Sequence, residues 1–205
     1  MFRLDAYLAQ GERVKIRSDA SPWGMGAFLM RGATLVSWYS VPITECDCHR
    51  FGHEIGDAAG QQTWEALAIL VALRLWSDHW RQERVLLDVS TDNVSALTVL
   101  ASLRGRGAGV SFIGRELALD FGQCAFLPDI VQHTPGVANV SADLLSRRFQ
   151  PDAKVIHGAV WAPPPGFSGS MEAHPPTRDE GYYRSLLAPP MPPPSAGRGE
   201  WGDTA

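Results

Sequence analysis

The chain has 205 residues, of which 45% are hydrophobic and 20% charged, and its formal net charge is −4. This length and composition are typical of one folded domain with some additional chain. The small negative charge argues against a protein that coats nucleic acid, which would be strongly basic, but it is compatible with an enzyme that meets nucleic acid through bound cations.

Three short strands are predicted in the first 40 residues, at 14–18, 24–30 and 33–40. Gly32 lies in the turn between the second and the third, which favours an antiparallel hairpin. Asp19 directly follows the first strand. A strand end suits a metal ligand, because the sheet fixes the backbone while the side chain reaches outward. An aspartate in a turn before a proline is also common without any function.

The segment 44–60 is rich in glycine and charge, and we expect a solvent-exposed loop there. Its cysteines and histidines are donors that suit a tetrahedral zinc site; they are Cys46, Cys48, His49 and His53. Their spacing fits no common zinc module, and the first three lie very close together. An exposed connection is therefore the favoured interpretation.

A helix is predicted over residues 62–80. Apolar side chains recur there at steps of three and four residues and form one apolar face; they are Trp64, Leu67, Ala68, Val71 and Leu75. Glu65 lies beside this face in the first predicted turn. The helix dipole favours a carboxylate at that place, so Glu65 has a structural explanation as well as a functional one.

The next elements are predicted strands at 84–90 and 126–132 and helices at 94–102, 110–122 and 141–148. Along the chain the order is strand, strand, strand, helix, strand, helix, helix, strand, helix. A mixed five-stranded sheet flanked by helices accommodates this order. We therefore predict one α/β domain over residues 1–150.

Two more carboxylates and a histidine lie near the ends of the later elements. Asp92 ends a strand and precedes a helix, so it could be a helix N-cap, although Asn93 could supply the cap instead. Asp143 lies near the start of the last predicted helix, where the dipole also explains it. His133 ends the last strand, and a lone histidine there is usually structural or exposed.

The four carboxylates have a common kind of placement, at strand ends and helix starts. Neighbouring strands through Asp19 and Asp92 would bring these two together, and Glu65 and Asp143 could close the cluster from flanking helices. Such carboxylates repel one another without cations, and Mg²⁺ prefers oxygen ligands. Two such ions about 4 Å apart can activate water and stabilise the leaving oxygen in phosphodiester hydrolysis. The pattern therefore predicts a two-metal nuclease site.

Four stretches of the chain resemble the ribonuclease H domain of retroelement reverse transcriptases, most closely the gypsy-type and related forms. They are SDASPWGMGAFL, WEALAILVALRLW, STDNVSAL and HTPGVANVSADLLSRR. In the last and most specific stretch, the residues that stand where the family motif has them are Gly136, Asn139, Ala142, Asp143, Leu145, Ser146 and Arg147. The resemblance covers residues 13–148 and implies a ribonuclease H-like fold.

The resemblance implies a metal-binding role for each of the four carboxylates. Asp19 would bridge two Mg²⁺ or Mn²⁺ ions. Glu65 and Asp92 would each hold one side of the site, and Asp143 would complete the site of the second ion. All four would therefore be catalytic residues.

The resemblance also implies a substrate. The family binds RNA–DNA hybrid and cuts the RNA strand, leaving a 5′-phosphate and a 3′-hydroxyl, and it recognises 2′-hydroxyl groups in the minor groove. His133 matches a mobile catalytic histidine that assists product release or proton transfer. Asn93 and Asn139 would approach the substrate backbone. A reverse transcriptase domain would lie upstream in the parent polyprotein.

The chain departs from the family in its positive charge, because the basic, Trp-bearing protrusion of cellular ribonucleases H is not evident. Between Asp92 and Asp143 only Arg104, Arg106 and Arg115 are basic, so we expect weak hybrid binding by the isolated domain. Two other interpretations stay open. One is an inactive relic that serves as a spacer or binding module, and the other is a transposase or integrase core that acts on DNA ends.

Residues 151–205 hold 11 of the 15 prolines, a density that prevents regular helix or sheet. We predict a Pro-rich, largely disordered tail with a short ordered patch at 181–187. Its proline runs could be SH3 or WW ligands, but a linker is the favoured interpretation.

The chain is expected to be intracellular, either cytoplasmic or nuclear. The three cysteines do not make a disulfide framework, which favours a reducing compartment. No apolar run reaches membrane-spanning length, and the first 15 residues lack the apolar core of a signal peptide. We therefore expect no membrane partner.

Overall fold

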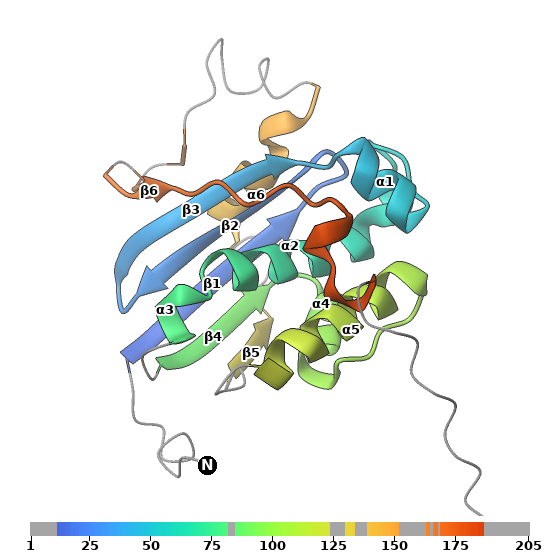
Figure 1. Ribbon diagram of the computed structural model, residues 1–205. Coiled ribbons are helices and arrows are strands. Elements are labelled where there is room, and N and C mark those ends of the chain that lie inside the picture. Colours follow the sequence, from blue (N-terminus) through green and yellow to red (C-terminus); the bar gives the residue numbers. More distant parts are fainter. Residues whose placement is uncertain are drawn as a thin grey trace, which may run out of the picture.

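The computed structural model describes residues 12–81, 85–123, 130–133, 139–151, 163–164, 166–167 and 169–186. Its centre is a six-stranded sheet of order β5-β4-β1-β2-β3-β6 (Figure 1). The strands are β1 Glu12–Ala20, β2 Gly24–Arg31, β3 Thr34–Pro42, β4 Val85–Thr91, β5 Ile130–His133 and β6 Met171–Glu172. The α-helices are α1 Glu45–Phe51, α2 Gln61–Leu75, α3 Asp78–Arg81, α4 Val94–Ser102, α5 Ala108–Gln123 and α6 Val140–Ser146.

The sheet is mixed. β2 is antiparallel to both β1 and β3, whereas β1, β4 and β5 run parallel to one another. Helix α2 crosses one face and packs with α4 and α5, while α6 lies on the other face against β1 and β2 (Figure 1). This is a mixed sheet with helices on both faces, so the predicted α/β class is confirmed. The five predicted strands form its main part.

Helix α2 is more deeply buried than its sequence suggests. Instead of one apolar face, all residues from Thr63 to Leu73 are buried, because the sheet covers one side and α4 and α5 cover the other. The single helix predicted over 62–80 is also two helices, since α2 ends at Leu75 and α3 begins at Asp78.

The exposed loop predicted over 44–60 is wrong in part, because it contains helix α1. A capping box starts this helix: the Thr44 side chain accepts from the Asp47 amide, and the Asp47 carboxylate accepts from the Thr44 amide. Gly52 ends it in the left-handed conformation, with φ of 70°. Asp47 is fully buried, so its carboxylate needs a partner from another part of the fold.

That partner comes from the C-terminal strap, which we define as residues 169–186. The strap adds β6 to the edge of β3 and then runs over α1, α2 and α5 (Figure 1). Arg178 bonds to Asp47, and Tyr183 is fully buried. A largely disordered tail was expected from residue 151 onward, but the strap packs on the domain well beyond the ordered patch predicted at 181–187.

Other predicted boundaries differ from the observed ones by a few residues. The strand predicted at 126–132 overlaps β5, although residues 124–129 lie outside the described part of the chain. The last predicted helix is α6 followed by a 3-10 turn, Arg147–Phe149. Among the described residues, no helix combines the length and apolarity needed to cross a bilayer.

Candidate metal centre

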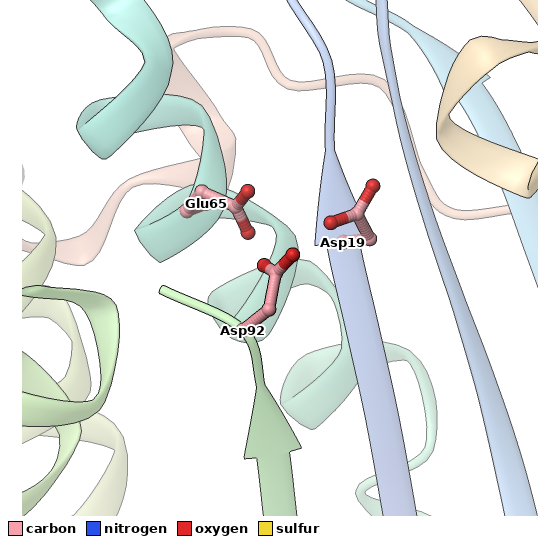
Figure 2. Close-up of side chains that lie close together, drawn as sticks. All are labelled: Asp19, Glu65 and Asp92. Atoms are coloured by element: carbon pink, nitrogen blue, oxygen red, sulfur yellow. The ribbon is translucent and has the colours of Figure 1, made fainter. Parts of the chain in front are cut away.

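The parallel pairing of β1 with β4 brings two predicted ligands together. The last pair of this ladder is Arg17 with Ser90. Two positions further in the same register lie Asp19, still within β1, and Asp92, which follows β4 directly. Register partners in a sheet project from the same face. Figure 2 shows the two side chains converging from the ends of these strands.

Glu65 joins them from helix α2 (Figure 2). One carboxylate oxygen from each of Asp19, Glu65 and Asp92 lies within 4.8 Å of the others. Because α2 begins at Gln61, Glu65 is beyond its first turn, and the dipole explanation loses weight. Asp19 and Glu65 are 4% and 2% exposed, whereas Asp92 is half-buried. The group is thus deep on one side and accessible on the other.

The pKa values of the two buried carboxylates, Asp19 and Glu65, are raised. Burial raises the pKa of Asp19 to about 7; a hydrogen bond from Ser146 opposes this, and the charges of Asp92 and Asp143 add to it. Burial is also the main cause that raises the pKa of Glu65 well above its usual value, with Asp19 and Asp92 contributing. Charged carboxylates so placed cost folding free energy, which a bound cation would offset.

Neutral side chains orient the two buried carboxylates. Gln61 Nε2 donates to Glu65 Oε1 at 3.0 Å and to the carbonyl oxygen of Ala20 at 2.5 Å, so it ties α2 to the end of β1. Thr91 Oγ1 donates to Glu65 Oε2 at 3.2 Å. These orienting residues were not predicted. Gln61 could have been found, since it lies one helical turn before Glu65.

Asp143, the fourth predicted ligand, is not in the group of three. Its Oδ1 accepts from Arg147 Nε at 2.5 Å, one turn along the chain, and its side chain is 38% exposed. It is nevertheless close enough to contribute to the raised pKa of Asp19. The structure therefore places Asp143 beside the cluster, with its carboxylate paired to a cation of its own helix.

The other predicted site residues have identifiable places. The Asn93 side chain caps α4 by accepting from the Ala96 amide at 3.0 Å. Asp92 is therefore not the cap. Asn139 is buried, and its Nδ2 donates to the Ser18 carbonyl at 3.1 Å, which ties the start of α6 to β1. The backbone of His133 pairs with Thr91 across β5 and β4, next to Asp92.

The zinc interpretation of the 44–60 segment finds no support. Within the part of the chain that the structure describes, Asp19, Glu65 and Asp92 form the one group of three or more potential ligands. Cys46 is exposed and Cys48 half-buried on α1. His53 packs its ring against Trp64.

Comparisons with known proteins add little to this geometry. No protein-family model and no curated protein sequence matches the chain. Among solved structures, LC11-RNase H1, isolated from compost by a metagenomic approach, is similar over 69% of this chain and 97% of its own length. The TM-score is 0.48 and the sequence identity 16%.

Proposed function

We propose that this protein is a divalent-metal-dependent ribonuclease H that cuts the RNA strand of RNA–DNA hybrids. The observation that carries the proposal is the group formed by Asp19, Glu65 and Asp92, whose oxygens lie within 4.8 Å of one another. These carboxylates come from three separate elements, in the chain order of the motifs that resemble the ribonuclease H family. Acidic residues on a surface are usually there because water solvates them, but two of these carboxylates are almost fully buried.

The donor set fits Mg²⁺ or Mn²⁺. All three donors are carboxylate oxygens, which hard ions prefer. The raised pKa values of Asp19 and Glu65 mean that their charged forms are unfavourable without a bound cation. When bound, such ions activate water and stabilise the leaving oxygen. The chain itself positions Glu65 through Gln61 and leaves Asp92 at the accessible side of the group.

A second ion would require Asp143. Its carboxylate lies in a surface pair with Arg147, and exposed pairs contribute about 0 to 1 kcal/mol. Exchange of Arg147 for a metal ion is therefore energetically accessible. In this proposal Arg147, once released, is available to contact a phosphate of the substrate, for which the guanidinium geometry is suited.

The remaining predicted roles belong to the same proposal. His133 would handle a proton or aid product release, and Asn93 and Asn139 would support the substrate side of the site. Arg104, Arg106 and Arg115 are exposed and would supply the few backbone contacts to the hybrid. The parent protein would be a retroelement polyprotein with a reverse transcriptase upstream.

The test is cleavage of a labelled RNA–DNA hybrid by the purified chain with Mg²⁺ or Mn²⁺. We expect internal cuts in the RNA strand only, with 5′-phosphate ends. Asp92→Asn should lower the rate at least about a thousandfold, which corresponds to roughly 4 kcal/mol of transition-state stabilisation. Asp78→Asn, which changes an exposed aspartate on α3, is the matched control and should keep full activity.

Other outcomes would support the rival interpretations. Undiminished cleavage by Asp92→Asn would contradict the proposed site. Cutting of a DNA duplex in place of the hybrid would favour a transposase or integrase core. A folded chain that neither binds Mn²⁺ nor cuts any substrate would favour an inactive relic.

A further inference from the structure

The end of helix α6 lies unusually close to β2, the strand that pairs with the Asp19 strand β1. Gly24 and Gly26 lie beneath it, and Gly26 is the partner of Asp19 across the β1–β2 ladder. A Cβ atom at Gly26 would overlap with Leu145, and one at Gly24 would lie 2.7 Å from the Ser146 carbonyl oxygen. Real Cβ contacts do not occur at such distances, so only glycines allow this approach.

Two serine hydroxyls hold the last carbonyls of α6 in place. Ser40 Oγ donates to the Leu145 carbonyl at 2.7 Å, and Ser21 Oγ donates to the Ser146 carbonyl at 2.8 Å. Both contacts are buried and join residues more than 100 positions apart in the chain. The backbone of Leu145 and Ser146 is therefore fixed from the sheet side.

This docking leaves the Ser146 hydroxyl against a proposed metal ligand. Ser146 is fully buried, and its Oγ donates to Asp19 Oδ2 at 2.7 Å. In Figure 2 one oxygen of Asp19 points towards Glu65 and Asp92, and the other points away from them, towards α6. The bond therefore fixes the rotation of the carboxylate.

We propose that Ser146 is a positioning residue of the metal centre, whose hydroxyl holds one oxygen of Asp19 so that the other faces Glu65 and Asp92. This inference rests on the proposed function. It adds a side chain that touches no metal or substrate but determines how well Asp19 is oriented to bind an ion. Partners of metal ligands typically change metal affinity by 10- to 100-fold when they are removed.

The hydroxyl also has a local acceptor, the Asp143 carbonyl, at 2.9 Å. Serine hydroxyls in helices often bond in this way without any function. A hydroxyl has one proton, and a carboxylate is the stronger acceptor. Ser146 and Asp19 are both buried, and a buried Asp19 oxygen without a hydrogen-bond donor would be unfavourable. The local bond is thus the rival explanation that an experiment must separate.

The experiment measures Mn²⁺ binding to the full chain by titration calorimetry at pH 8, with no substrate present. Ser146→Ala should weaken Mn²⁺ binding about tenfold. Ser146→Cys keeps a side chain of similar size with a much weaker donor. Its Mn²⁺ affinity should lie between those of the unchanged chain and Ser146→Ala. Ser40→Ala is the matched control, because it removes a hydroxyl hydrogen bond of the same 2.7 Å length that ends on α6 and not on Asp19. It should change affinity less than about twofold.

Each outcome separates the inference from the proposed function. If the unchanged chain binds no Mn²⁺, the proposed function fails first. If the chain binds Mn²⁺ and Ser146→Ala binds it equally well, Ser146 has no positioning role, while the proposed function stands. Equal weakening by Ser146→Ala and Ser40→Ala would assign the effect to the docking of α6 and would also overturn the inference.

The Mn²⁺ dependence of hybrid cleavage gives a second readout, and a loss of folding would not produce the same change. Ser146→Ala should need about tenfold more Mn²⁺ to reach its half-maximal rate, and its rate at saturating Mn²⁺ should stay within a few-fold of the unchanged chain. A loss of rate that high Mn²⁺ does not restore would contradict positioning through Asp19. If Ser146→Ala does not fold, Ser146→Cys carries the same comparison.

Discussion

Two groups of buried and half-buried carboxylates lie in the described part of the chain, and their electrostatic surroundings are opposite. In the metal-centre group, Asp19 and Glu65 accept hydrogen bonds from neutral side chains, and their pKa values are raised. In the group beneath the C-terminal strap, arginines hold the carboxylates of Asp47, Glu116 and Asp120 at 2.7 Å.

The strap group shows what a structural buried acid looks like in this protein. Burial alone would raise the pKa of Glu116, but hydrogen bonds from Ser185 and Arg74 outweigh it, and the pKa lies below its usual value. Among the residues that the structure describes, arginines form ion pairs with the acids beneath the strap and not with Asp19 or Glu65. We infer that the first group is arranged for a cation from solution.

The largest effect on stability is expected from breaking the strap's most buried ion pair. Arg178 and Asp47 have side chains that are 5% and 0% exposed. Arg178→Met would leave the Asp47 charge buried without its cation, which typically costs about 3–5 kcal/mol. Urea unfolding of the full chain measures the loss.

The control is Arg148→Met, because Arg148 bonds to Glu172 at the same 2.7 Å distance but with 30% and 34% exposure. Exposed pairs contribute about 0–1 kcal/mol. Equal losses in the two variants would show that burial does not distinguish the strap pair from a surface pair. The role assigned to the strap would then be wrong.

At the candidate metal centre, removal of a charge is expected to raise the free energy of unfolding of the metal-free protein, not to lower it. A carboxyl whose folded pKa is raised stabilises the fold most below its unfolded pKa, and this stability is lost as the pH rises through the folded value. For Asp19 that window runs from about pH 4 to about pH 7. Asp19→Asn should therefore stabilise the metal-free protein at pH 8 by up to about 4 kcal/mol, and change little at pH 4.

Thermal unfolding at the two pH values, with a chelator and then with Mg²⁺, measures this effect. Mg²⁺ should stabilise the unchanged chain by mass action, and Asp19→Asn should lose most of that stabilisation. A variant that is less stable than the unchanged chain at pH 8 without metal would show that Asp19 is held by structural contacts, as the strap acids are.

The sequence predicts the metal-centre group better than the strap, for a physical reason. Asp19 lies near the end of one hydrophobic strand and Asp92 directly after another, and the two strands pair in parallel, so their positions bring the two carboxylates together. The sequence also offered Asn93 in place of Asp92 as the cap of α4, and this is confirmed. These contacts depend on regular periodicity, which a sequence displays directly.

The strap depends on contacts between residues far apart in the chain, for example 68 and 131 positions apart, and no local pattern marks them. Arg178 lies among prolines, and their density says nothing of packing on another surface. Asp47 was hidden in a segment whose glycines and charges suggested a loop. The buried Tyr183 was within the predicted ordered patch, yet its position against Phe51 and Phe112 follows only from the tertiary fold.

The smallest expected effect tests the strap's own pH dependence. Glu116 has a lowered pKa, so its contribution is present above the unfolded value of 4.5 and is lost as the pH falls through the folded value. Glu116→Gln should cost about 1 kcal/mol at pH 7, because the carboxylate charge opposite Arg74 is removed, and the cost should be smaller at pH 3. Urea unfolding at the two pH values measures both. A cost that is the same at pH 3 and pH 7 would mean that the Glu116 charge does not contribute, and the two groups of buried acids would then differ in packing and not in charge.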